Sequence, residues 1–375
     1  MFEGDQQSWM AGPWASVGLL IDPNTGSNYA NPGLSANGFT GTAPNIAGKF
    51  TGKNWAVYVD GEWDVSEALL LQLAFRHEDF SEFGTTNDGK LAARFNVSEN
   101  FTLRGGVSTG FRAPTPGQAN VTTITTSFDG VTGMQVQEGT VRPTDPLAVS
   151  LGGKALVPED AFNVSLGFAA RSRILNMTVD FYRVEVDNRI IKSRSLPVTG
   201  DPNFTELAFY TNALSTETQG LDFVVFLTGS LNTDFSLAYN YNETDVVSQT
   251  QVNNVDPVSE STVFNIENNL PKHRATATLV HRMGKISAML RANFYGDTID
   301  ERGTREEVGT ETLFDVEFGY SVNNNFKIIV GASNVFDNFP DEIDTRLSQG
   351  MPYPRRTPIG YHGGVTYLRG VFNFR

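Results

Sequence analysis

The sequence predicts an all-β fold, namely a transmembrane antiparallel β-barrel of about fourteen strands with short turns at one end and long loops at the other. Three observations predict it. Apolar and polar residues alternate in segments of about ten residues, helical periodicity is nearly absent, and short and long connections alternate along the chain. A tilted strand needs about 9–11 residues to cross a bilayer, so the segments have a suitable length.

The composition agrees with this class. Among the 375 residues, 39% are apolar and 19% are charged, both low for a soluble globular protein. The 36 glycines and 27 phenylalanines suit many strands and turns. No run of 18 apolar residues is present, so a membrane-spanning helix is not expected. The N-terminal MFEGDQQSWMAG is not a signal peptide, and for an exported protein we expect a mature or truncated start.

The charge and the cysteine count exclude several function classes. The chain has no cysteine, which removes disulfides, thiolate metal sites and cysteine nucleophiles. The net charge of −14 argues against a nucleic-acid partner, because neutralising phosphates requires clustered Lys and Arg.

The predicted strands share one pattern, with apolar side chains on one face and polar side chains on the other. In NWAVYVDGEWD, Trp55, Val57 and Val59 oppose Asp60 and Glu62. The same alternation recurs in 69–77, 101–109, 161–170, 235–242, 286–295, 313–320 and 367–375.

The connections distinguish a barrel from a soluble sandwich. Short turns are expected at 64–68, 97–100, 171–174, 229–233, 283–285 and 322–325. Between them come longer loops at 78–88, 111–160, 195–206, 244–273, 297–310 and 337–361. This regularity is typical of strands that cross a membrane back and forth, with short periplasmic turns and long extracellular loops. A soluble β-rich binding or hydrolytic protein has no reason to sort its loops in this way.

Charged residues in the middle of the predicted strands indicate which face of the sheet is exposed to water. They would be costly in a dry core unless paired, so we expect them to line a lumen while the apolar face meets lipid. They are Asp60, Glu62, Arg104, Asp222, Arg291, Asp315 and Glu317.

Two strand ends carry further signals. In GFRAPTPGQAN, Pro114 and Pro116 cannot donate to a ladder, so strand pairing is predicted to end near Phe111, where a long loop begins. The last strand, YLRGVFNFR, carries an apolar, aromatic-ended face on the short-turn side, with Arg375 after the final aromatic. That face, which we expect to serve barrel assembly, consists of Leu368, Gly370, Phe372 and Phe374.

Several stretches together resemble the barrel region of TonB-dependent outer-membrane receptors. They are STGFRAPTPGQ, FYRVEVDNRI, TNALSTETQGLDF, ASNVFDNFP and the aromatic C-terminal strand, and the resemblance covers most of residues 50–375. It implies a non-enzymatic receptor in the outer membrane of a Gram-negative bacterium. Such a receptor takes up a large, scarce ligand (siderophore iron, cobalamin, haem or an oligosaccharide), energised by TonB acting on a plug inside a 22-stranded barrel.

The sequence departs from that family in one respect. With about fourteen predicted strands and no recognisable plug or TonB box, residues 1–375 are expected to form a single receptor-like barrel region without a plug domain, as a truncated form of a receptor. The implied partners are outer-membrane lipid, the barrel assembly machinery, a small-molecule or oligosaccharide ligand, and TonB through a plug that this chain lacks. A passive porin-like channel is the alternative function.

No catalytic, cofactor-binding or metal-binding residue is predicted. The four histidines show no ligand spacing, and the acidic loop 297–311 reads as a solvated surface. Ligand capture is assigned to the long loops 111–160, 244–273 and 337–361 without naming residues, and Arg112 at the start of the first loop receives no role.

Overall fold

The computed structural model describes residues 2–9, 19–21, 28–30, 47–128, 135–201, 204–229, 232–301, 304–343, 352–354 and 356–374. Parts of four predicted long loops, namely 129–134, 202–203, 302–303, 344–351 and 355, lie outside the described residues, as do residues 230–231 of the predicted turn 229–233.

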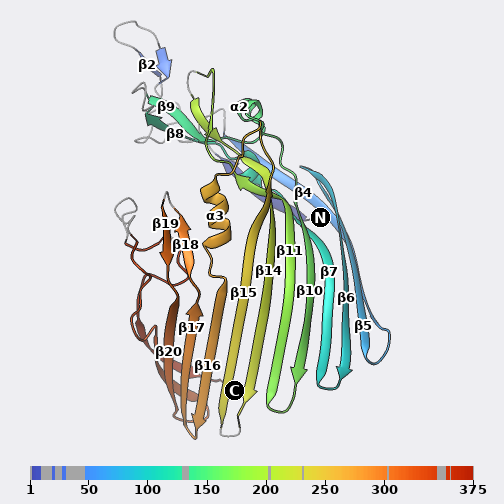
Figure 1. Ribbon diagram of the computed structural model, residues 1–375, viewed down its shortest axis with the longest axis vertical. Helices are drawn as coiled ribbons and strands as arrows, with labels where there is room; N and C mark the ends of the chain where they lie inside the picture. Colours follow the sequence, from blue (N-terminus) through green and yellow to red (C-terminus); the bar gives the residue numbers. More distant parts are fainter. Residues whose placement is uncertain are drawn as a thin grey trace.

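Fourteen antiparallel strands form one large sheet, as the alternation predicts (Figure 1). Each strand except the outermost two pairs with the strands before and after it in the sheet order. The order is β1 (Phe2–Trp9), β4 (Gly48–Asp64), β5 (Leu69–Phe80), β6 (Gly84–Ser98), β7 (Phe101–Arg112), β10 (Glu159–Arg171), β11 (Leu175–Lys192), β14 (Tyr210–Thr228), β15 (Thr233–Gln249), β16 (His273–Met283), β17 (Ile286–Tyr295), β20 (Glu311–Ser321), β21 (Phe326–Ser333) and β22 (Val365–Phe372).

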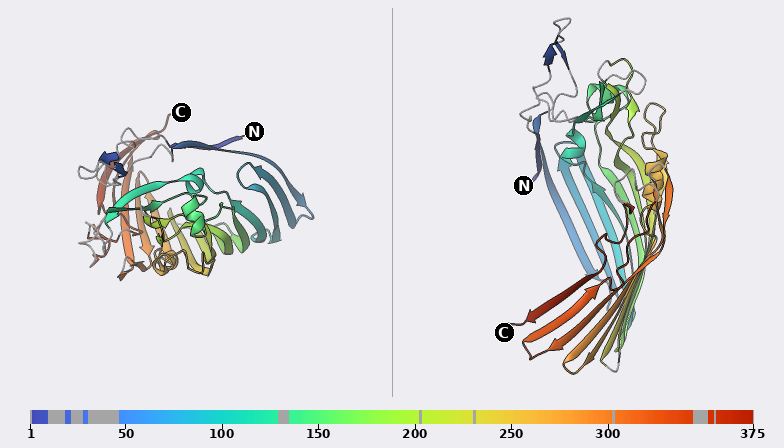
Figure 2. Two further views of the ribbon diagram at one scale, coloured as in Figure 1. Left: turned by 90° about the horizontal axis from the view of Figure 1, so that it is seen from above. Right: turned by 90° about the vertical axis from the view of Figure 1, so that its left-hand side faces the viewer.

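The sheet is a curved arc and not a closed cylinder (Figure 2). In the described part of the chain, β1 and β22 are its two edges and do not pair with each other. The structure is therefore a partial barrel.

The connections at the short-turn end agree with the prediction. Strands β4 and β5, for example, are joined through 65–68, and β16 and β17 through 284–285. One predicted long loop, 78–88, is wrong, because β5 runs to Phe80 and β6 begins at Gly84. The polar residues of this stretch belong to β5 and β6, which continue beyond the apolar band. A polar segment at this place is therefore part of a strand and not a loop.

Smaller elements occupy the long-loop end. Helices α1 (Pro116–Asn120) and α2 (Pro146–Ser150) lie between β7 and β10, and α3 (Glu260–Asn268) lies between β15 and β16. None of the helices in the described residues is long and apolar enough to cross a membrane. The short strands are β2 (Leu19–Ile21), β3 (Asn28–Ala30), β8 (Thr123–Phe128), β9 (Gln135–Thr140), β12 (Leu196–Pro197), β13 (Phe204–Ala208), β18 (Thr298–Glu301) and β19 (Arg305–Val308).

The two faces of the sheet follow the predicted alternation. On the apolar face, Leu166 and Phe318 expose 63% and 62% of their surface. On the polar face, side chains meet across an intervening strand: Arg104 of β7 pairs with Asp180 of β11 over β10, and the Tyr367 hydroxyl of β22 donates to Glu317 of β20 over β21 at 2.6 Å. Side chains converge in this way on the concave side of a curved sheet, so the polar face is the inner one.

Candidate functional site

The long-loop end is the candidate site, and the structure refines the three predicted loops. The loop predicted at 111–160 spans 113–158 between β7 and β10, and that at 244–273 spans 250–272 between β15 and β16. The loop predicted at 337–361 falls within 334–364 between β21 and β22. Strand β15 runs to Gln249 and so reaches further into the second loop than its polarity suggested, whereas β16 begins at His273.

The first loop and the connection between β11 and β14 fold together into one unit, which we call the loop cap (the described residues of 113–158 and 193–209). Strands β12, β13, β9 and β8 form its four-stranded sheet, in which β13 runs parallel to β9. The cap has a dry core of its own, and partly buried Leu147, Leu151 and Val252 pack against it. The buried core residues are Val141, Ala148, Leu196, Leu207 and Phe209.

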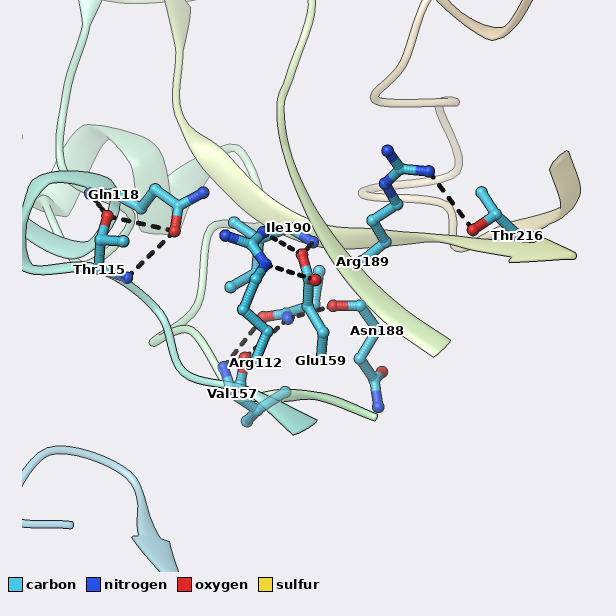
Figure 3. A network of polar contacts seen from close by, with 10 residues as sticks. Arg112, Thr115, Gln118, Val157, Glu159, Asn188, Arg189, Ile190 and Thr216 are labelled. Atoms are coloured by element: carbon cyan, nitrogen blue, oxygen red, sulfur yellow. Dashed lines mark hydrogen bonds and ion pairs between the residues drawn. The ribbon is translucent and has the colours of Figure 1, made fainter. Parts of the chain in front are cut away.

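A buried carboxylate anchors the loop cap to the sheet (Figure 3). The Arg112 Nε donates to Glu159 Oε2 at 2.7 Å, and a second guanidinium nitrogen contacts Oε1. The backbone N–H of Ile190 also donates to Glu159 Oε1 at 2.7 Å. The Arg112–Glu159 pair therefore holds the two ends of the first loop together, and Glu159 ties them to β11.

Two neighbouring contacts reinforce this anchor. The Asn212 side-chain amide donates to the Val157 carbonyl at 2.9 Å and accepts from the Val157 N–H at 3.0 Å. At the start of α1, Thr115 and Gln118 form a reciprocal capping box after Pro114, which fixes the direction in which the chain leaves β7 (Figure 3).

Polar contacts join the loops above the C-terminal half, and loop 250–272 also packs on β14 through the buried side chain of Val258. The buried Asn265 of α3 donates to the Glu301 carbonyl at 3.0 Å and accepts from the Glu301 N–H at 3.2 Å. Arg305 lies 3.9 Å above the Phe264 ring, a cation–π contact between β19 and α3. In loop 250–272, a hydrogen bond to Glu243 raises the pKa of Lys272 above its ordinary value.

Loop 334–364 contains a stack of three aromatic rings. Phe339 and Tyr353 lie 5.9 Å apart between ring centroids, and Tyr353 and Tyr361 lie 6.0 Å apart, with planes inclined by 13° and 16°. Gly364 N–H donates to Asp337 at 2.7 Å and fixes the loop beside this stack. Through this offset stacking, the described part of the loop packs on itself by its own side chains.

A large hollow of about 710 Å³ lies between β4, the turn after β5 and the first loop. Its walls include three aromatic side chains and two cationic ones beside the carboxylate of Glu82, so the lining is aromatic and carries one net positive charge. The aromatic and cationic members are Phe50, Phe80, Phe83, Lys49 and Lys53. Sequence reasoning missed this group because its members come from β4, the end of β5 and the turn after it, and the register of the two strands is not visible in the sequence.

The charged residues predicted to face the lumen lie on the inner face of the sheet, and several of them are paired with neighbouring side chains. Asn240 donates to Asp222 at 2.7 Å, Asn293 donates to Asp315 at 3.0 Å, and Arg369 contacts Glu317 at 3.0 Å.

Where two side chains meet across an intervening strand, a glycine on that strand leaves room for the contact. A Cβ on Gly167 would lie 2.1 Å from the Asp180 carboxylate that receives Arg104, and a Cβ on Gly220 would lie 2.1 Å from the Tyr182 ring. Tyr182 thereby reaches Asn242, whose amide donates to its hydroxyl at 2.8 Å.

The C-terminal strand lies at the edge of the arc with its apolar face outward. Leu368 and Phe372 are opposite Val330 and Phe326 of β21, and the strand ends at the short-turn end as predicted. Phe374 follows the strand and is 90% exposed. For metal chemistry, no grouping of three or more His, Asp or Glu suited to a metal ion occurs among the described residues.

Comparison with known proteins decides the family. The family model for the TonB-dependent receptor-like β-barrel matches residues 2–335. The chain belongs to this family. The match explains the short and long connections and the polar inner face together.

Individual relatives are receptors and transporters, not enzymes. The chain is 24% identical over 293 residues to the ferric enterobactin receptor PirA of Pseudomonas aeruginosa, covering 75% of this chain and 36% of that protein. It is 22% identical to the vitamin B12 transporter BtuB of Photobacterium profundum, covering 76% of this chain and 39% of that one.

A solved structure shares the fold. The siderophore receptor PirA of Acinetobacter baumannii superimposes with a TM-score of 0.65 at 15% identity, over 98% of this chain and 51% of that one. The chain thus spans about half the length, or less, of these relatives.

Proposed function

We propose that the chain is the barrel region of an outer-membrane receptor that takes up a large, scarce ligand, with a ferric siderophore as the first candidate and cobalamin as the second. The observation that carries the proposal is the combination of a lipid-compatible outer face, a polar inner face and built loops at one end only. The named ligands of the relatives, ferric enterobactin and vitamin B12, indicate the size class.

In this proposal the long-loop end is extracellular and captures the ligand. Loops 111–160, 244–273 and 337–361 supply the surface, and the hollow between β4 and the first loop offers the aromatic and cationic groups that an anionic iron chelate requires. The outer face meets membrane lipid in the outer membrane of a Gram-negative bacterium.

Residues 1–375 act as one barrel region. The matched family model is the barrel, so coupling to TonB requires a plug domain outside these residues. The outward residues Leu368, Gly370, Phe372 and Phe374 are the proposed signal to the barrel assembly machinery, because they present an exposed apolar edge at the short-turn end.

Ligand binding and passive flux separate this function from a porin-like channel. We would refold the chain in detergent, titrate it with ferric enterobactin and with cyanocobalamin, and then measure sugar-driven swelling of proteoliposomes. Saturable binding of either ligand without swelling supports the receptor. Swelling without saturable binding contradicts it and supports the channel.

A further inference from the structure

Loop 250–272 contacts two other structures at the long-loop end, the loop cap and the hairpin formed by β18 and β19 (Figure 1). Its first residues meet the cap, and its helix α3 meets the hairpin. The loop therefore joins the parts of the long-loop end that lie above the two halves of the sheet.

The first part of the loop enters the cap as a tight turn. Asn253 and Asn254 have positive φ angles of 50° and 60°, and Val252 and Val255 exchange backbone hydrogen bonds of 2.9 and 3.0 Å across them. Two left-handed central residues define a type I′ turn, in which asparagine is favoured. The turn packs Val252 against the cap core, and Gly152 leaves room for it, because a Cβ there would lie 2.4 Å from Val252 Cγ1.

Hydrogen bonds fix the turn to the cap. The Asn253 side chain donates to the Ser150 carbonyl at the end of α2 at 3.1 Å, and the Arg194 N–H donates to the Pro257 carbonyl at 2.7 Å. Pro257 is fully buried, and Val258, the next residue, is buried against β14. The loop is thus attached to both the cap and the sheet directly before α3.

The helix α3 holds the hairpin. Asn265 donates to the Glu301 carbonyl and accepts from the Glu301 N–H, so it satisfies the backbone of β18 as a neighbouring strand would. On β19, Arg305 lies over the Phe264 ring and pairs with Glu301 at 3.0 Å. With nine residues the helix is about 13 Å long, and it separates the cap contacts from the hairpin contacts.

We propose that loop 250–272 is a strap that makes the loop cap and the β18–β19 hairpin open and close as one unit. Helix α3 begins at Glu260, three residues after the buried Pro257, and carries Asn265 in its second turn. A cap that opens and displaces Pro257 therefore also shifts the helix and pulls Asn265 away from the hairpin. Two local openings linked through one element are coupled, and the coupling is reciprocal.

The proposal goes beyond the proposed function, because the coupling belongs to the folded chain and requires no ligand. The test is hydrogen exchange of the full chain, folded in detergent without ligand. Asn265→Ala removes both bonds to Glu301, while alanine preserves the helix. We expect exchange at the Val141 amide, which donates to Ala208 inside the cap, to accelerate about fivefold or more, although residue 265 is on the hairpin side of the strap.

The matched control is Asn268→Ala on the same helix. Asn268 donates to the Phe264 carbonyl at 2.9 Å, just as Asn265 donates to the Ser261 carbonyl at 2.8 Å, so both substitutions remove the same kind of bond within α3. Only Asn265 also holds Glu301. Exchange at Val141 should therefore be the same in Asn268→Ala as in the unmodified chain.

The reciprocal experiment loosens the cap end of the strap. Val252→Ala withdraws the side chain that packs on the cap core, and the amides of 298–301 in the hairpin should then exchange faster by a similar factor, about fivefold. Equal exchange at Val141 in the two asparagine variants, or unchanged hairpin exchange in Val252→Ala, would overturn the proposal. If Asn265→Ala does not fold, the Val252→Ala result decides alone. Failure to bind ferric enterobactin or cobalamin would leave these rates, measured without ligand, unchanged.

Discussion

Apolar side chains are buried in the loop cap but exposed on the outer face of the fourteen-stranded sheet, which we call the wall. In the cap, Phe209 and Leu207 are fully buried, and in the wall Leu166 and Phe318 stand outward with more than half of their surface exposed. Both regions come from one chain and adjoin at Glu159. The cap removes apolar surface from water by folding around it, whereas the wall requires lipid tails to do so. Solvent, and not residue type, therefore decides which face of each segment is covered.

The largest expected effect is in the cap core. Phe209→Ala leaves a cavity among Val141, Leu196 and Leu207, and should destabilise the cap by about 3–5 kcal/mol. The loss is measured by hydrogen exchange at the Val141 amide, which donates to Ala208.

The matched substitution in the wall is Phe318→Ala. Lipid tails close around the shortened side chain, so only the transfer contribution of about 1.5–3 kcal/mol is expected, measured by urea unfolding in lipid. If the wall substitution cost as much as the cap substitution, the outer face would be packed against protein, and the contrast between the two regions would fail.

Adjacent residues of β15 test the two faces of the wall directly. Leu237 points outward and Ala238 inward, where Ala238 is exposed. Leu237→Arg should cost about 2–4 kcal/mol near the bilayer midplane, measured by unfolding in lipid vesicles. Ala238→Arg should change the stability by no more than about 0.5 kcal/mol, because its side chain enters a polar lumen. A larger cost for Ala238→Arg than for Leu237→Arg would mean that the outer and inner faces of the sheet are assigned the wrong way round.

Much of the wall could be predicted from sequence because its rule is local. Alternation in 161–170 identifies the outward face of Leu166 without knowledge of any partner, and the turns at 171–174 and 283–285 follow from where alternation pauses. The same rule failed at 78–88, where polar strand residues above the apolar band resemble a loop.

The cap and the cross-strand neighbours within the wall could not be predicted in this way. Leu196, Leu207 and Val141 meet through a parallel pairing of β9 with β13, which are separated by more than sixty residues. Arg94 and Arg104 become neighbours only through the register of β6 against β7. Contacts of this kind depend on long-range pairing, which one sequence does not display.

The anchor between cap and wall should give a smaller effect. Arg112→Gln leaves the buried Glu159 carboxylate with only the Ile190 N–H among the contacts described above, and should loosen the cap by about 1–3 kcal/mol. Hydrogen exchange in 138–158 should accelerate while the wall amides stay protected. As a control, Arg183→Gln breaks an exposed pair with Glu217 and should cost at most about 1 kcal/mol. Equal exchange in both variants would mean that the cap holds itself without the anchor.

The smallest expected effect concerns the glycines that let side chains pass over a strand of the inner wall. Gly220→Ala places a Cβ against the Tyr182 ring and should displace its hydroxyl from Asn242, at a cost of about 0.5–1.5 kcal/mol. At Gly110, near the end of β7, a Cβ meets no atom within 4 Å, so Gly110→Ala should be neutral or stabilise by about 0.5–1 kcal/mol. Urea unfolding in lipid, followed by tryptophan fluorescence, measures both variants. A Gly220→Ala variant as stable as Gly110→Ala would show that the contact over β14 contributes nothing to the wall, and that the inner face is held by neighbouring-strand pairs alone.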